Sequence, residues 1–263
     1  MFNKILPIVV GILALPVLLQ AESARTEFIF PVFANTRPVA PTCDYWQSRF
    51  TVFNPNSTST TATFTIFDGE SSTGVSDTMQ VNAFGFETRA LAARPSAPFS
   101  VAWLKVTAPQ PIMVTETVEH LLGCGSSTTI LDLRGKLDLN AAETTRREFI
   151  LVRFNRDYRI DTGISIVFPS ETPTLTAHGK LIHRWVDGRT VSEKNIVIPA
   201  NGQLISLLNE ILPEESLKFS PDGLIAGTIE LTFDREVFIT AIQFDSVLEA
   251  LEEHLTQPLT TAF

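Results

Sequence analysis

Arg49–Gly69 reads RFTVFNPNSTSTTATFTIFDG, and this stretch decides the fold class. Apolar residues alternate with other residues, mostly threonines, on both sides of a break at Asn54-Pro55. Period-two alternation that is bounded by Pro, Asn and Gly is typical of a half-buried antiparallel β-hairpin. We therefore expect two paired strands whose inward residues are Phe50, Val52, Phe64 and Ile66. The opposite face should carry Thr51, Thr61, Thr63 and Thr65.

The same pattern returns in Gly163–Gly188, which reads GISIVFPSETPTLTAHGKLIHRWVDG. The landmarks that match between the two copies are Phe53 with Phe168, Asp68-Gly69 with Asp187-Gly188, and Thr107 and Thr115 with Thr232 and Thr240. The spacing between the copies grows only at turns, where insertions are tolerated. The chain is therefore expected to contain two copies of one all-β unit.

Two tandem antiparallel β-sandwich domains are the predicted architecture. The predicted boundaries are a signal peptide over 1–24, a first domain over 25–139, a linker over 140–147, a second domain over 148–245, and a C-terminal helix and tail over 246–263. Helical spacing of apolar residues predicts a short helix over Gln203–Leu212 in the second domain and another over Ser246–Leu255.

Further strands follow from alternation and from turn residues. They are expected over 27–33, 86–92, 99–107, 112–120, 148–154 and 193–198, with 227–233 and 237–244 forming a closing hairpin. The polar stretch Ser71–Asp77 is expected to be a loop, and Thr129–Leu133 could add a short strand.

Composition is that of a globular protein, with 44% hydrophobic and 19% charged residues and a formal net charge of −9. This charge argues against a nucleic-acid partner, because phosphate neutralisation needs a basic face.

Met1–Ala24 has the features of a secretory signal. Lys4 precedes the apolar run Ile5–Leu19, and small residues follow, which leaves the cleavage position open. An uncleaved membrane anchor is the alternative, although the run is shorter than the ~20 residues that span a bilayer. We expect an exported protein without a membrane span in its mature chain, located in the periplasm, at the cell surface or outside the cell.

Cys43 and Cys124 are the two cysteines. An even pair in an exported chain favours a disulfide, and two separate buried thiols are the alternative. Neither cysteine has a CxxC or histidine companion at ligand spacing, so no metal site is expected.

The opening motif resembles a repeat of exported bacterial proteins. The residues that carry the resemblance are Phe30-Pro31-Val32-Phe33-Ala34-Asn35, followed by Arg49–Gly69, and in the second unit Asp161–Ile166, Ile198–Leu204 and Glu210–Pro213. Two departures are Phe168-Pro169, which lacks the Asn before Pro, and the tight Asp68-Gly69. The resemblance implies an immunoglobulin-like fold in the cell envelope and no established biochemical activity, so it assigns no site residues.

Catalytic motifs are missing from the sequence. There is no GxSxG, HExxH, GxxxxGK[ST] or GxGxxG, and we expect no enzyme activity, no cofactor and no metal. His178 and His183 are five residues apart on an expected strand and should point to opposite faces, as surface or turn histidines.

Two groups of residues are candidate ligand contacts. Arg153, Arg156 and Arg159 concentrate positive charge near the domain boundary, as a solvated interdomain face or as a docking patch for an anionic surface. Trp46 and Trp185 could contact a ligand such as a sugar, whereas Trp103 is expected in the core.

The leading hypothesis is an exported, non-catalytic structural or interaction protein of the bacterial cell envelope. One alternative is a surface module that binds glycans or proteins, which exposed aromatic residues on one sheet face would favour. Another is a pilus-assembly-type periplasmic chaperone, which needs an exposed edge strand and basic residues in an interdomain cleft. A hydrolase is the last. Partners would be envelope or surface proteins or glycans, and the oligomeric state stays open.

Overall fold

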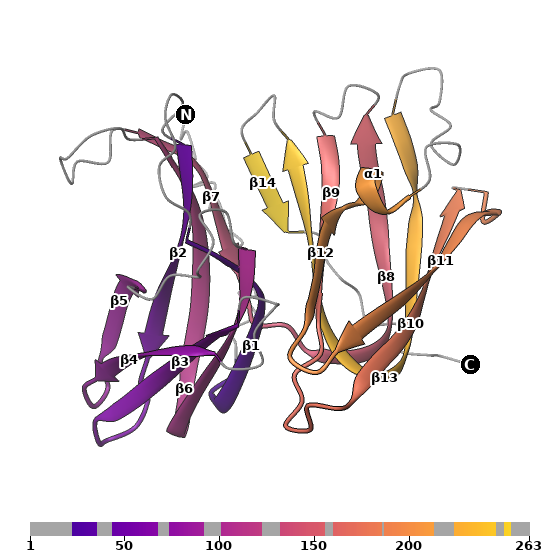
Figure 1. The fold of residues 1–263 in the computed structure, drawn as a ribbon. Helices are drawn as coiled ribbons and strands as arrows, with labels where there is room; N and C mark the ends of the chain where they lie inside the picture. The colour runs from indigo at the N-terminus through magenta and orange to yellow at the C-terminus, as the bar shows by residue number, and fades with distance from the viewer. Residues whose placement is uncertain are drawn as a thin grey trace, which may run out of the picture.

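The structure is a computed structural model that describes residues 23–35, 44–67, 74–91, 101–122, 132–155, 160–185, 187–212, 224–245 and 250–253. In these residues two seven-stranded antiparallel sheets follow one another along the chain and stand side by side (Figure 1). Residues 1–22 of the expected signal peptide (1–24) and both cysteines, Cys43 and Cys124, lie outside the described residues.

The first sheet has the strand order β4-β3-β6-β2-β5, and β1 and β7 also pair with β6. Its strands are β1 (Arg25–Ala34), β2 (Asp44–Phe53), β3 (Thr60–Phe67), β4 (Val75–Val81), β5 (Phe86–Ala90), β6 (Val101–Leu122) and β7 (Asp132–Leu139). β4 begins in the stretch that the sequence predicted to be a loop.

The second sheet has the order β11-β10-β13-β9-β12, and β8 and β14 also pair with β13. Its elements are β8 (Thr144–Asn155), β9 (Ile160–Val167), β10 (Thr176–Trp185), β11 (Thr190–Pro199), β12 (Gln203–Leu207), α1 (Leu208–Ile211), β13 (Leu224–Asp245) and β14 (Ala250–Glu253). Strand for strand this is the topology of the first sheet, so the predicted internal repeat is confirmed. One predicted landmark is wrong by a residue: Val167, not Phe168, corresponds to Phe53, because Val167 pairs with β12 and β13 as Phe53 pairs with β5 and β6.

The predicted hairpin of the opening stretch is wrong in its pairing. β2 and β3 do not pair with each other, because β6 lies between them in the sheet. β6 is one strand of 22 residues rather than the predicted two. It pairs with β1 and β3 through Val101–Thr107 and with β2 and β7 beyond Ile112. Pro109 and Pro111, which lack an N–H, fall between Thr107 and Ile112, where the register of β6 with β1 shifts.

The predicted closing hairpin is likewise one long strand, β13, whose pairing with β8 shifts register between Thr232 and Val237. Each sheet therefore curls over its own long strand and encloses a core. In the first domain Phe50 from β2 and Phe64 from β3 meet across this core, with ring centroids 5.3 Å apart. The predicted inward residues Phe50, Val52, Phe64 and Ile66 are all buried, which confirms the alternation.

Both predicted helices are largely wrong. Gln203–Leu207 forms β12, which pairs with β9, and only Leu208–Ile211 is helical. Ala250–Glu253, inside the predicted C-terminal helix, forms β14 and pairs with β13. Short helices are marginal on their own, and a neighbouring strand with free backbone groups satisfies the same residues better. The all-β class is established, while the immunoglobulin-like class stays a prediction.

The two domains meet in a buried junction. Trp103 of β6 is fully buried there, stacks on Phe67 with ring centroids 4.1 Å apart, and donates from Nε1 to the Asn201 carbonyl at 3.0 Å. The Ser165 hydroxyl and the Gln203 amide both donate to the Pro31 carbonyl, at 2.6 and 2.8 Å.

The chain crosses between the sheets over residues 140–143, and β8 has begun by Thr144. No helix among the described residues has the length and hydropathy to cross a bilayer.

Candidate functional site

The outer face of β5, β2 and β6 presents a row of large apolar side chains. Phe86 of β5 lies opposite Phe53 of β2, which in turn lies opposite Met113 of β6. Phe86 is 73% exposed and Phe53 38% exposed, although both are aromatic residues at strand positions. Phe84, in the turn that enters β5, is 67% exposed. We call Phe53, Phe84, Phe86 and Met113 the aromatic face; β5 lies at the edge of the molecule away from the second domain (Figure 1).

A polar row runs beside the aromatic face on the same strands. Thr88, Thr51 and Thr115 are cross-strand neighbours, and the hydroxyls of Thr51 and Thr88 are hydrogen-bonded at 2.9 Å. Farther along, Arg49 bonds Glu119 through Nε at 3.2 Å. The surface thus changes from aromatic to hydroxylic to charged along β2.

Phe84 adopts a backbone conformation that suits few side chains. Its φ is +52°, in the left-handed region that costs a bulky residue about 1–2 kcal/mol. The matching turn of the second domain has Asn201 at this place, with φ +57°. The two turns correspond because Gly85 donates to the Asn82 carbonyl and Gly202 to the Pro199 carbonyl. Asn adopts positive φ more readily than Phe does. The first domain therefore has an exposed Phe at a position where the backbone conformation favours Asn.

The Asn54 side chain links the turn that contains Phe84 to the loop between β2 and β3. Its side chain is fully buried; the amide donates to the Thr58 and Asn82 carbonyls, at 2.8 and 3.0 Å, and Oδ1 accepts from the Asn56 N–H at 3.0 Å. In the second domain, which lacks an Asn before Pro169, Asn201 of the opposite loop accepts from the Ser170 N–H at 3.1 Å. Each domain therefore ties the same two loops with one Asn side chain.

The counterpart of the aromatic face in the second domain is not open. Gln203, Val167 and Phe238 form the row that corresponds to Phe86, Phe53 and Met113. Val167 is fully buried, and together with Phe238 it packs on Ile29 and Trp103 of the first domain. One face of the repeat is thus a protein-docking surface in the second copy and an exposed aromatic surface in the first.

The tryptophans that the sequence marked are partly buried. Trp46 packs with Val118 and Ile242 in the junction, and it lines a cavity there. Trp185 packs against the core of the second domain, with its ring 6.2 Å from that of His183. Trp103 is buried as predicted, but in the junction. The structure does not bring Trp46 and Trp185 into one site.

The candidate arginines lie outside what the structure describes. Arg156 and Arg159 are not among the described residues, and the side chain of Arg153 is not described.

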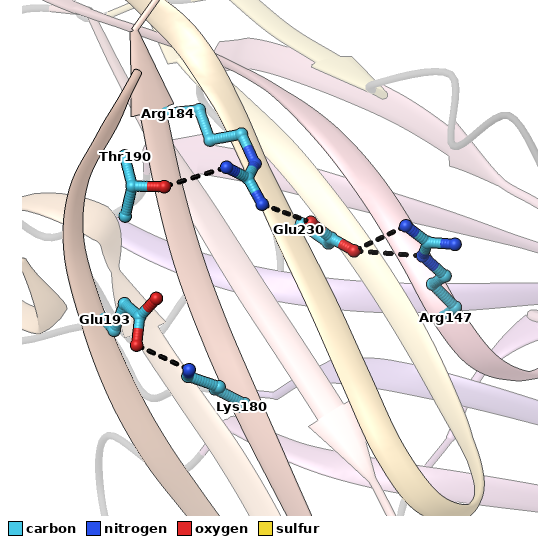
Figure 2. A network of polar contacts seen from close by, with 6 residues as sticks. All are labelled: Arg147, Lys180, Arg184, Thr190, Glu193 and Glu230. Atoms are coloured by element: carbon cyan, nitrogen blue, oxygen red, sulfur yellow. Dashed lines mark hydrogen bonds and ion pairs between the residues drawn. The ribbon is translucent and has the colours of Figure 1, made fainter. Parts of the chain in front are cut away.

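Arg147 is described, and it forms a charged network on the outer face of the second sheet (Figure 2). Arg147 Nη2 and Arg184 Nη2 contact the two carboxylate oxygens of Glu230 at 2.7 and 3.0 Å, and Arg184 also donates to Thr190. Lys180 and Glu193 pair beside it at 2.5 Å.

The Figure 2 network stabilises the sheet and leaves no free carboxylate. Partial burial opposes the ionisation of Glu230, but hydrogen bonds from Arg184 and Arg147 outweigh it and lower the pKa of Glu230. Because each oxygen of Glu230 faces an arginine, we assign the network no separate function.

Three titratable groups among the described residues, Glu116, Glu148 and His183, are buried with polar atoms that lack a well-formed hydrogen bond. Glu116 of β6 is fully buried, neither carboxylate oxygen has a hydrogen bond of normal geometry, and burial raises its pKa to about 8, an effect that the neighbouring Ser48 hydroxyl partly offsets. Burial also raises the pKa of Glu148 and lowers that of His183. His183 is buried and His178 exposed, which confirms their opposite orientation but not a surface location for His183.

Catalytic or metal-binding geometry does not arise from these groups. Among the described residues there is no cluster of three or more His, Cys, Asp or Glu that could hold a metal ion. His183 faces Ser192 across β10 and β11, but both of its ring nitrogens and the serine hydroxyl lack partners.

Sequence reasoning missed the aromatic face. The alternation of Arg49–Gly69 puts Phe53 on the face opposite to Phe50, but nothing in it indicates that Phe84 and Phe86 lie beside Phe53. The signal was present in Asn82–Gly85, which reads NAFG and matches PANG at Pro199–Gly202. An Asn-to-Phe difference at the same turn position of two copies marks the site.

Comparisons with known proteins place the chain in no family: no family model and no curated protein matches it. Among solved structures the chain is similar to the crystal structure of Thermotoga maritima 1070, with 9% identity and a TM-score of 0.32, over 45% of this chain and 93% of that chain. A similarity at this level carries no inference about function.

Proposed function

We propose that this protein is an exported, non-catalytic interaction module of the bacterial cell envelope, and that the aromatic face of its first domain docks a partner protein. The observation that carries the proposal is the repeat itself. The corresponding face of the second domain packs on a β-sheet domain, whereas Phe53 and Phe86 remain exposed. Exposed aromatic residues in one patch are typical of binding surfaces.

The edge position of β5 fits this role. A partner strand could extend the sheet beyond β5, and its side chains would then lie beside Phe86. Phe84 supports the same conclusion, since a residue held at positive φ and two-thirds exposed contributes little to folding.

Glycan binding is a second candidate, and the threonine row favours it. Sugar rings stack on aromatic faces and take hydrogen bonds from hydroxyls such as those of Thr51, Thr88 and Thr115. The chaperone hypothesis lacks comparable support, because its basic anchor residues fall on side chains that the structure does not describe.

Site-specific photocrosslinking tests the proposal. A benzoylphenylalanine in place of Phe86 should give a discrete adduct in the producing cells, and the adduct should disappear when Phe53→Ser is added. The matched control carries the crosslinker at Leu151, a residue of β8 that is 60% exposed on the other domain. An adduct at Phe86 that protease removes supports a protein partner; one that only glycosidase removes supports the glycan alternative. Equal crosslinking at both positions, or none at Phe86, would overturn the proposal.

A further inference from the structure

A cavity of about 330 Å³ lies in the junction between the two domains. The first domain contributes Val32, Trp46 and Val118 to its walls, and the second contributes Ile205 and Ile242. Val32, Val118 and Ile242 are each less than a tenth exposed, whereas Ile205 is 41% exposed at the rim. A cavity of this volume with apolar walls is within the range of small-molecule sites.

The cavity is held in shape by hydrogen bonds that cross the junction. Ser165, which lines it, donates to the Pro31 carbonyl at 2.6 Å, and Gln203 donates to the Ser165 hydroxyl at 3.1 Å. Ser165 is buried, Gln203 is partly buried, and the two are bonded to each other and to the first domain, so this wall is preformed and a ligand need not order it.

Glu210 sets the charge of the cavity. Among the described lining residues it is the one that carries a charge at neutral pH. Its Oε2 accepts hydrogen bonds from the Ser206 hydroxyl at 2.7 Å and from the Leu207 N–H at 3.0 Å. These bonds, that of Ser206 first, lower the pKa of Glu210 and fix its carboxylate, while no described residue bonds Oε1.

We propose that this junction cavity binds an organic cation with an apolar tail, the tail against Trp46 and the apolar walls and the cationic head at Glu210 Oε1. An anionic amphiphile would meet the Glu210 carboxylate and a chain of net charge −9. A purely apolar ligand would fill the apolar walls but would make no use of the exposed Glu210 carboxylate. The indole of Trp46 adds a surface that also attracts cations. This site is separate from the aromatic face and does not depend on the function proposed for it.

Two probes with one tail and opposite heads test the charge preference. The full chain is titrated calorimetrically with n-octylammonium and with n-octanoate, both below their micelle concentrations. We expect octylammonium to bind about tenfold more tightly than octanoate, from one favourable and one unfavourable partly exposed charge contact. Equal affinities would overturn the proposal, as would tighter binding of octanoate.

Variants locate the binding. Glu210→Gln should reduce the difference between the two probes to about twofold or less while n-octanol still binds, which shows an intact cavity. Ile205→Lys places a cation at the rim and should weaken octylammonium binding several-fold. The control Leu151→Lys makes the same change at an exposed aliphatic residue outside the cavity and should have no effect. Equal loss in both lysine variants would overturn the assignment, and so would a stable dimer of the chain that binds no octylammonium, because a second copy would then cover the cavity.

Discussion

Phe84 and Asn201 occupy the same position in corresponding turns of the two domains, so exchanging these two residues tests what each contributes. Replacing Phe84 by Asn gives the first domain the residue that the second domain uses at the same φ. Phe84 is 67% exposed, so the variant loses only about a third of the apolar burial of a Phe, worth roughly 0.5–1 kcal/mol. Relief of the left-handed conformation returns about 1–2 kcal/mol. We therefore expect Phe84→Asn to stabilise the first domain by about 0.5–1 kcal/mol while it weakens partner binding.

The reverse change, Asn201→Phe, should act in the opposite direction. It introduces the same backbone cost and removes the hydrogen bond from Ser170 to Asn201 Oδ1, which is worth about 1 kcal/mol. The expected destabilisation is about 2–3 kcal/mol. The Asn201 carbonyl that accepts from Trp103 is main chain, so the junction keeps this bond.

Urea unfolding of the full chain measures both changes, with the slope checked so that only shifts of the midpoint are read as stability. The crosslinking assay at Phe86 measures binding in the same variants. If Phe84→Asn destabilises the protein, Phe84 has a structural role and the aromatic face loses its main support. If the variant is more stable and still crosslinks fully, Phe84 does not contact the partner.

Three other predictions follow from the folded chain. The stability of the wild type relative to Glu116→Gln should fall as pH rises from about 4.5 to about 8, by up to about 1.4 kcal/mol per pH unit, because unfolded Glu116 ionises in this window and folded Glu116 stays protonated; the contributions of Glu148 and His183 are common to both proteins, so a difference between their urea melts that does not change with pH would contradict the burial argument. Phe64→Ala should destabilise by about 3–5 kcal/mol and Thr63→Ala by less than about 1 kcal/mol, and similar losses in denaturant melts would show that both faces of β3 are buried. Cys43 and Cys124 should be disulfide-bonded, because Asp44, next to Cys43, is paired across β2 and β6 with Leu122, two residues before Cys124; intact mass of the non-reduced protein showing two free thiols would refute the bond.

Alternation predicted the faces of the strands but not their partners. Phe50 and Phe64 are buried as expected, since their side chains must share one side of a pleated strand whatever its neighbours are. That β6 separates β2 from β3 depends on contacts between residues far apart in sequence, which local pattern does not record. The prolines at 109 and 111 lie between the two predicted strands 99–107 and 112–120, whereas the structure has one strand there whose register with β1 shifts.

The helix errors have a different origin. The spacing of Leu204, Leu207 and Leu208 is helical. The first two nevertheless belong to strand β12, because the edge of β9 provides backbone groups with which this segment can pair. The internal repeat indicates strands at these places. If the second domain has the topology of the first, it needs counterparts of β5 and β7, and these are β12 and β14. A topological requirement of this kind outweighs helix propensity, which differs between residues by only tenths of a kcal/mol.

The comparison of the two copies also separates structural from functional residues. Inward positions stay apolar in both, because each domain must enclose its own core. The outer face of β5, β2 and β6 differs from its counterpart on β12, β9 and β13, where Val167 is sealed against Trp103. If Phe84 served only folding, the first domain would be expected to have at position 84 a residue that adopts positive φ easily, as the second domain has Asn at position 201. Exposure and backbone strain at one place, next to an open sheet edge, therefore support the proposal that a partner binds this surface.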